Sequence, residues 1–262
     1  MLVKILKDKF RPLFYQTFIS WHKKYKCKQT ERLFYSYKDK HKNESCFIVA
    51  NGPSLRMDDL DEIMKLGLPT FGVNRIYKIF DTTKWRPTYM AVQDETILMD
   101  SCKEIQKECL GIPLFLRSTG YSKYDIDGGI YFNSDISYSN KGIIPPFMDG
   151  SNCVFAEGLT IVYTVMQLAV YMGFKNIYLL GCDCSYKTLS HVSSNDYVDK
   201  RLATGVKLGM PPAVEYWFKV YSVANEYALK HDLSIYNVTR GGMLEVFERK
   251  DLDKLIFELS KK

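Results

Sequence analysis

A short polar motif follows the first strongly apolar stretch of the chain. The apolar residues 47–50 run directly into Asn51, Gly52, Pro53 and Ser54. Gly52 lets the backbone approach an anion closely, Pro53 suits the first position of a helix, and Ser54 offers a hydroxyl beside helix N–H groups. This motif could hold a phosphate, although an ordinary strand-to-helix turn needs no ligand. It is neither a Walker loop nor a dinucleotide fingerprint, because the Lys-Ser/Thr pair and the spaced glycines are missing.

Two further strand-like segments also end in polar side chains. The segment TFGV runs into Asn74, and PTYMAV runs into Gln93 and Asp94. The carboxyl ends of parallel strands share one edge of a sheet, where ligands of open α/β proteins bind. We therefore expect Asn51, Asn74 and Asp94 to lie along one such edge.

Two later segments repeat the pattern. NIYLL is followed by Gly181 and Asp183, and SIYN is followed shortly by Arg240. A glycine beside a polar cluster at a strand end predicts a second wall of the same site. Single polar residues are common in loops, so the inference depends on their recurrence in register.

The elements between these segments are predicted to be helices. Residues 161–172 are apolar on nearly every side, which indicates a buried helix that ends at Gly173. Further helices are expected at residues 58–66, 211–230 and 252–259. Because strands and helices alternate, we expect an α/β fold with a Rossmann-like, mainly parallel sheet and helices on both faces.

We expect one catalytic domain over residues 44–262, with loop or lid excursions at 121–150 and 187–210. His191 lies in the second excursion, and its ordinary pKa suits a general base. Glu215 competes for that role, because a helix would hold it more rigidly. Burial against its aromatic neighbours would raise the pKa of Glu215 towards neutrality.

The first 43 residues form a basic stretch. Apolar residues recur there at three- and four-residue steps with lysines and arginines between them, which predicts an amphipathic helical segment. Such a helix can lie on an anionic membrane surface, or its apolar stripe can pack on the catalytic domain or on a partner protomer. Both alternatives stay open. In the first, residues 1–40 hold a cytoplasmic protein peripherally on the inner face of the membrane.

The composition limits the other classes of protein. The 262 residues are 46% hydrophobic and 25% charged, as in a globular domain with a full core. Seven scattered cysteines indicate neither a disulfide framework nor a zinc site, which fits a reducing cytosol. We expect no signal peptide and no membrane span, since charges interrupt the apolar runs. Outside the first 43 residues, acids match the basic residues, which disfavours nucleic-acid binding. The sequence leaves the oligomeric state open, including a homo-oligomer.

Four of these motifs together resemble a known group. In order, FIVANGPSL, FGVNRIY, MGFKNIYLLGCDCSY and IYNVTRGG resemble the MptE-like family, and more distantly the bacterial lipooligosaccharide sialyltransferases and the Maf-type flagellin glycosyltransferases. The resemblance covers roughly residues 46–250. The sialyltransferase branch implies a Rossmann-like glycosyltransferase that uses a CMP-sugar donor without a metal-bearing motif.

The resemblance also implies roles for the strand-end residues. Asn51, Gly52 and Ser54 would meet the donor phosphate and ribose. Asn74 would meet the CMP portion, and Gln93 or Asp94 would meet the sugar. The acceptor would be a glycan or lipid-linked glycan, and the segment at residues 121–150 could carry contacts with it.

Further roles follow in the second half of the chain. Thr160 would help to hold the nucleotide, while Tyr186 and Arg240 would stabilise the departing phosphate. The sialyltransferases carry an arginine shortly before the apolar helix, where this chain has Glu157. A rough alignment places Glu215 at the position of their catalytic histidine.

Three functions are therefore weighed. The first is an inverting glycosyltransferase that adds a sialic-acid-like or related sugar to a cell-surface glycan. The second is an MptE-like diphosphokinase that transfers diphosphate from ATP to a small alcohol, with Mg²⁺ held by paired carboxylates such as Asp94 and Asp183. The Thr-Arg-Gly-Gly of residues 239–242 is closer to this branch. The third is a non-catalytic nucleotide-binding protein. No resident cofactor or metal is expected in the first case.

Overall fold

A computed structural model describes residues 21, 23–119, 122–184 and 213–261. In this part of the chain, nine strands form one sheet in the order β6-β5-β4-β3-β2-β1-β7-β8-β9. Every neighbouring pair is parallel. The expected α/β fold with a Rossmann-like parallel sheet is therefore confirmed.

The strands are β1 (Ser45–Val49), β2 (Thr70–Val73), β3 (Tyr89–Val92), β4 (Leu114–Arg117), β5 (Ile130–Asp135), β6 (Val154–Ala156), β7 (Asn176–Leu180), β8 (Ser234–Asn237) and β9 (Glu248–Arg249). β1, β2, β3, β7 and β8 lie at predicted segments, whereas β5, β6 and β9 were not predicted. The four residues of β1 after Ser45 are all buried. Such continuous apolar strands are typical of a parallel sheet that is covered on both faces.

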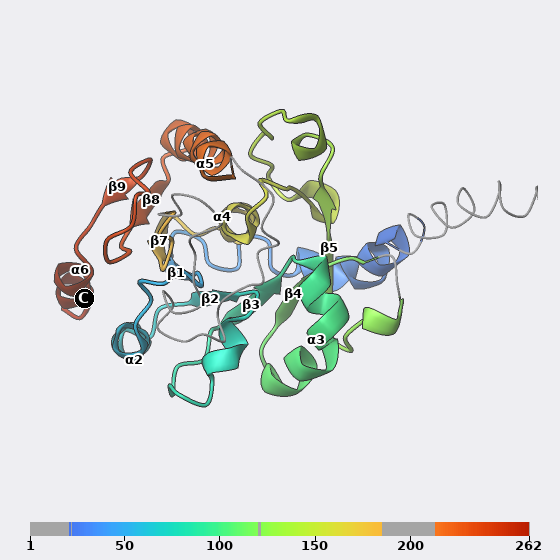
Figure 1. Cartoon of the computed structure of the whole chain (residues 1–262), viewed down its shortest axis with the longest axis horizontal. Helices are drawn as coiled ribbons and strands as arrows, with labels where there is room; N and C mark the ends of the chain where they lie inside the picture. Colours follow the sequence, from blue (N-terminus) through green and yellow to red (C-terminus); the bar gives the residue numbers. More distant parts are fainter. Residues whose placement is uncertain (1–20, 22, 120–121, 185–212, 262) are drawn as a thin grey trace, which may run out of the picture.

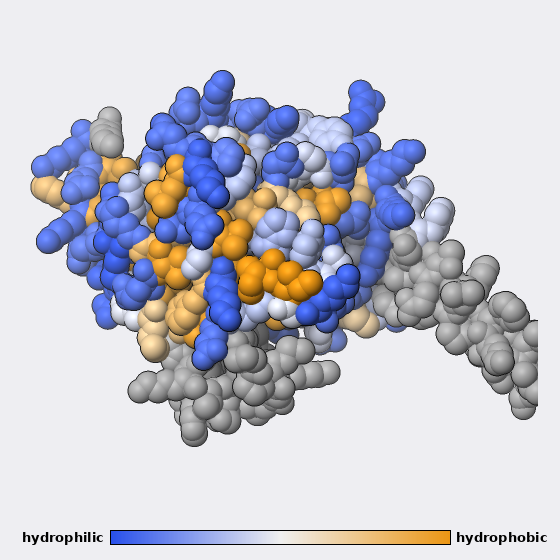
Figure 2. Space-filling model, turned by 90° about the horizontal axis from the view of Figure 1, so that it is seen from above, coloured by the Kyte–Doolittle hydropathy of each residue, from blue (hydrophilic) through white to orange (hydrophobic). Residues whose placement is uncertain are grey.

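Helices cover both faces of this sheet (Figure 1). They are α2 (Met57–Lys65), α3 (Glu95–Glu108), α4 (Ile161–Tyr171), α5 (Ala213–Lys230) and α6 (Leu252–Leu259). Figure 1 shows α4 and α5 above the sheet and α2 and α3 below it. Seen from above, charged and polar side chains surround a band of apolar ones (Figure 2). No helix in the described ranges is both long and apolar enough to cross a membrane.

A buried glutamine fixes the central helix α4 to the edge of the sheet. Gln167 accepts hydrogen bonds from the backbone N–H groups of Met148 and Ala156, and it donates to the carbonyl oxygens of Ala156 and Tyr163. All four hydrogen-bonding positions of this amide are thus used, as a fully buried polar group requires. These bonds fix α4 to Ala156, the last residue of β6.

The strand order reverses at the centre of the sheet. Chain connections run outward in one direction from β1 to β6, and β7 then pairs on the other side of β1. In open α/β sheets the ligand lies outside the carboxyl ends of the strands at such a switch point. The residues that follow β1 and β7 are therefore the first place to look for a site.

Residues 23–43 pack on the domain. Phe34 is fully buried, with ring centroids 6.3 Å from Phe115, 5.9 Å from Phe155 and 4.8 Å from Tyr171. His41 Nε2 lies 2.6 Å from the hydroxyl of Tyr89. The packing alternative thus describes these residues, whereas the membrane alternative stays a prediction for residues 1–20, which lie outside the described part.

Two expectations are wrong. Residues 121–150 were expected to be an irregular excursion, but they contain β5, whose first three residues are buried beside β4. Pro53 was expected to open a helix. It lies in a turn closed by the bond from Leu55 N–H to the Gly52 carbonyl, and α2 begins four residues later, at Met57. The second excursion, at 187–210, lies outside the described residues.

Candidate functional site

Hydrogen bonds join the carboxyl ends of three neighbouring strands. Asn51, after β1, donates from Nδ2 to the Val73 carbonyl of β2 at 3.1 Å. Asn74, after β2, accepts from the Gln93 N–H at 3.3 Å, and its own N–H donates to the Ala91 carbonyl of β3 at 2.9 Å. The predicted row of polar residues is therefore brought together at one edge of the sheet.

The loops after β1 and β7 cross in close contact at the switch point. The N–H of Gly52 donates to the Gly181 carbonyl at 2.9 Å. A Cβ atom on Gly52 would lie 1.9 Å from Asp183 Oδ2 and 2.3 Å from that carbonyl oxygen. Gly181 itself has a φ of 71°, in the left-handed region that favours glycine. Both glycines are thus required by the crossing.

Ser54 is engaged by Asp183. Its N–H donates to Asp183 Oδ1 at 3.2 Å and its hydroxyl donates to Oδ2 at 2.9 Å. These donors were expected to stand beside the start of a helix, ready for a phosphate. Their partner is instead a buried carboxylate of the same protein, so the contact of Ser54 with a donor stays a prediction.

Burial and hydrogen bonding act in opposite directions on Asp183. Burial raises the pKa of its carboxyl, while the bonds from Ser54 and the charge of Arg249 lower it. Burial is the larger effect, so the pKa lies above its ordinary value. Its backbone carbonyl also accepts from Met243 N–H at 2.7 Å. Asp183 therefore ties the loops after β1, β7 and β8 together.

A second polar cluster lies at the ends of β3 to β6, and the sequence predicted only its Gln93. Arg117, the last residue of β4, places its guanidinium 3.2 Å from Glu157 Oε2. Both side chains are largely buried, with 13% and 12% exposed. Gln93 and Ser134 lie close enough to the Glu157 carboxylate to lower its pKa. We call these four residues the polar wall.

Several buried atoms along this edge make no hydrogen bond within the described chain. They are Asn51 Oδ1, Arg75 Nε, Gln93 Oε1, Ser134 Oγ and Glu157 Oε2. Buried polar atoms are nearly always paired, because an unmet one costs about 1–3 kcal/mol. A row of such atoms at the ligand edge of an α/β sheet is expected of a site built to receive hydrogen bonds from a ligand.

Two expected donor-binding residues act as helix caps. Asp94 accepts from the N–H groups of Thr96 and Ile97 and so caps α3. Thr160 caps α4 through the N–H of Val162, and its hydroxyl lies 3.3 Å from that of Tyr221. Capping explains both residue types without a ligand, and their contacts with a donor stay predictions.

The remaining candidates differ in their surroundings. Glu215 is exposed on the first turn of α5, so its expected burial is wrong. Arg240 pairs with Asp59 and Asp253, which join α2 to α6. Its guanidinium is thereby engaged within the protein. Tyr186 and His191 lie outside the described residues.

The paired carboxylates expected of a diphosphokinase are far apart. Asp94 follows β3 and Asp183 follows β7, which are three strand positions apart in the sheet. At about 4.8 Å per strand, this is roughly 14 Å, too far to share one Mg²⁺ ion. Within the described ranges no three His, Cys, Asp or Glu residues gather as a metal site.

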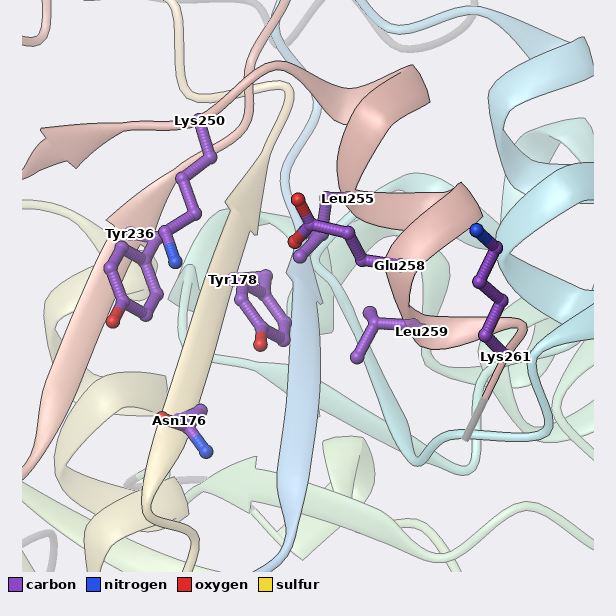
Figure 3. Close-up of a pocket in the computed structure, with 8 residues that line it drawn as sticks. All are labelled: Asn176, Tyr178, Tyr236, Lys250, Leu255, Glu258, Leu259 and Lys261. Carbon is purple, nitrogen blue, oxygen red and sulfur yellow. The ribbon is translucent and has the colours of Figure 1, made fainter.

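Two cavities lie elsewhere on the molecule. One, of about 550 Å³, lies between β7, β8 and α6, where Tyr178 and Tyr236 stand side by side (Figure 3). It includes Asn176, the first residue of β7, and so extends to the amino end of the sheet. The other, of about 480 Å³, is lined by Thr239, Arg240 and Arg249 near the switch point. Neither is lined by the polar wall.

The fold is that of a doubly wound α/β protein, with buried polar side chains along the carboxyl ends of its strands from β1 to β6. Residues 16–188 match the family model described as 6-hydroxymethylpterin diphosphokinase MptE-like, and the chain belongs to this MptE-like family. No curated protein sequence matches the chain.

One solved structure shows the same fold. The MAf glycosyltransferase from Magnetospirillum magneticum AMB-1 superposes with a TM-score of 0.51 at 14% sequence identity. The match covers 90% of this chain and 42% of that chain. The present chain thus spans less than half of that glycosyltransferase, and the likeness establishes the fold.

Proposed function

We propose that this protein is a glycosyltransferase that moves a sugar from a nucleotide donor, a CMP-sugar, to a cell-surface or lipid-linked glycan. The row of buried polar atoms that make no hydrogen bond, along the carboxyl ends of β1 to β6, carries the proposal. The glycosyltransferase activity of the structural neighbour is consistent with it. The transferred sugar is sialic-acid-like or related.

Asn51 is suited to the nucleoside of the donor. Its Nδ2 is fixed by the Val73 carbonyl, which leaves the unpaired Oδ1 as a hydrogen-bond acceptor. An amide oxygen accepts from ribose hydroxyls or a base amine and does not bind phosphate oxygens. We therefore assign Asn51 to the ribose or the base.

Arg75 is suited to the donor phosphate. It directly follows Asn74 at the end of β2, and its Nε is buried without a hydrogen bond. A guanidinium binds phosphate oxygens through several N–H groups and keeps its charge at every accessible pH. Arg75 replaces Arg240 in this role, since Arg240 is already paired with Asp59 and Asp253.

The diphosphokinase reading is the second candidate, because the family description names that activity. It requires a site for Mg²⁺ and ATP, for which Asp94 and Asp183 are too far apart to act as the expected pair. A panel of CMP, UDP, GDP and ATP, each with and without Mg²⁺, separates the two candidates by thermal shift. A ligand that binds the native state raises the melting temperature.

We expect CMP to raise the melting temperature without Mg²⁺, and Asn51→Ala to abolish this rise. Asn225→Ala is the matched control, because Asn225 Nδ2 also donates to a backbone carbonyl, that of Val246, at 3.1 Å. The control should lose similar stability and keep the shift. A shift with ATP and Mg²⁺ alone would overturn the glycosyltransferase assignment in favour of the diphosphokinase.

The basic N-terminal stretch would bring the enzyme to a lipid-linked acceptor on the inner face of the membrane. Removal of residues 1–20 tests this without touching Phe34, which a deletion of residues 1–40 would remove from the core. The shortened protein should sediment less with anionic liposomes at low salt. Unchanged sedimentation would leave the membrane role without support.

A further inference from the structure

Glu157 is held rigidly at the ligand edge. Its N–H donates to the carbonyl of Asp135, the last residue of β5, at 3.0 Å. It directly follows β6 and stands three residues before Thr160, the N-cap of α4. The neighbouring strand and helix thus fix its backbone on both sides. A catalytic group needs this kind of support, because small displacements of a reacting atom reduce rates strongly.

The side chain of Glu157 is oriented without being fully engaged. Arg117 lies 3.2 Å away in an ion pair, yet Oε2 makes no hydrogen bond of good geometry. In the same polar wall, Gln93 Oε1 makes no hydrogen bond, and Ser134 Oγ lies close enough to the Glu157 carboxylate to lower its pKa but makes no hydrogen bond of good geometry. Hydroxyl groups of a ligand would satisfy these atoms, since each can accept a hydrogen bond.

Charged and titratable groups face Glu157 from three elements. Arg117 from β4 lowers the pKa of its carboxyl, and Asp94 at the start of α3 raises it. The charge of Glu157 also raises in part the pKa of the Tyr216 phenol on α5. Burial is the largest influence, and it raises the pKa of Glu157 above its ordinary value. A carboxylate in this setting is a stronger proton acceptor than an exposed one.

The other carboxylates of this edge are less suited to accept a proton. Asp183 receives three bonds from Ser54, and Asp94 is used as a helix cap. Glu215 is exposed on α5. Glu157 alone of these four is both largely buried and free of backbone donors in the described chain.

We propose that Glu157, oriented by Arg117, is the general base of the transfer reaction; this rests on the proposed function. An acceptor hydroxyl held by the polar wall gives its proton to the Glu157 carboxylate. The oxygen of that hydroxyl forms a bond to the anomeric carbon of the donor sugar. The bond from that carbon to the phosphate oxygen breaks, and its electron pair leaves on the nucleotide phosphate.

The test uses the full chain with CMP-N-acetylneuraminic acid as the probe. The readout is the release of CMP as the sugar is transferred to water or to added lactose. Glu157→Gln should lower turnover about 10²-fold or more, while the CMP-induced thermal shift is kept. Glu226→Gln is the matched control, because Glu226 is exposed on α5 and outside the site. It should leave turnover unchanged.

The pH profile separates a base from a structural residue. Turnover should fall at acid pH as Glu157 becomes protonated. In Arg117→Gln the acid limb should move to higher pH, because removal of the positive charge raises the carboxyl pKa. Arg117→Lys keeps the charge and should show little of this shift. A structural role would move the melting temperature and leave the limb in place.

The outcomes are distinguishable. If CMP binds but Glu157→Gln keeps its turnover, the base assignment fails and the proposed function stands. If no CMP shift and no CMP release occur in the unaltered protein, both fail. If Glu157→Gln does not fold, Glu157→Asp provides the readout: it keeps the charge and shortens the reach, and unchanged turnover would overturn the proposal.

Discussion

Asp183 and Glu157 are two buried carboxylates at the same edge of the sheet, and they differ in their partners. Asp183 receives the N–H and hydroxyl of Ser54 and is enclosed by Gly52. Glu157 has one ion pair and lies among atoms that have no partner. Burial raises the pKa of both. Burial alone therefore does not separate a structural carboxylate from a reactive one, whereas the state of its hydrogen bonds does.

This contrast divides the site into two regions with different expected responses to mutation. At the switch-point crossing, polar atoms satisfy one another, so their loss should reduce stability. In the polar wall, Gln93 Oε1 and Ser134 Oγ make no hydrogen bond of good geometry, so the loss of these atoms should reduce binding or turnover and largely spare stability. The following predictions test this division, beginning with the largest effect.

Gly52→Ala should destabilise the protein by about 3 kcal/mol or more, because its Cβ would overlap Asp183 and the Gly181 backbone. The free energy of unfolding in urea measures this cost. Gly67→Ala is the control: Gly67 has a φ of 67° but nothing within 4 Å of an added Cβ. It should cost roughly 1 kcal/mol from backbone strain alone. Equal losses for the two variants would mean that the crossing is not tightly packed.

Ser54→Ala should cost about 1–2 kcal/mol, because it removes the hydroxyl bonded to the buried Asp183 carboxylate. A double-mutant cycle with Asp183→Asn should show a coupling energy above about 0.5 kcal/mol. Additive losses would show that the two side chains do not stabilise each other.

The same cycle gives a pH dependence. The folded-state pKa of Asp183 is raised, so its contribution to stability is fully present below its unfolded pKa and is lost as the pH rises through the folded value. Asp183→Asn lacks this titration. Relative to the unaltered protein, it should therefore gain stability as the pH rises through that window, and a constant difference would contradict the assignment.

Ser134→Ala should change the free energy of unfolding by less than about 0.5 kcal/mol, because its Oγ makes no hydrogen bond of good geometry. This is the same substitution as Ser54→Ala, at the other region of the site. Donor turnover should fall while stability is kept. A loss of stability as large as that of Ser54→Ala would remove the distinction between the two regions.

The sequence predicted the fold through patterns that are local. The runs at 47–50, 70–73 and 176–180 are short, apolar and ended by turn-forming residues, and each is a buried strand. β5 was missed because glycines precede it and its last three residues are polar and half-buried. β9 has only two residues, too few to form a pattern.

The site was predicted in part for the same reason. Asn51, Asn74 and Gln93 each directly follow a predicted strand, and parallel pairing then brings them together. Arg117 and Glu157 come from strands that are two apart in the sheet and forty residues apart in the chain, so no local spacing reveals their ion pair. Arg117 is a polar residue at the end of the apolar run of β4, just as Asn74 ends the run of β2, and this signal would have identified it.

The central position of β1 affects how the protein is made. On one side, β1 pairs with β7, which is synthesised about 130 residues later. Phe34 likewise packs against Phe155 and Tyr171, which are synthesised more than 100 residues after it. Contacts between distant segments form slowly, and unpaired strand edges attract other chains meanwhile. During synthesis the emerging N-terminal half therefore presents an open apolar edge and an uncovered aromatic side chain. We expect its yield in cells to depend on chaperones that shield nascent chains.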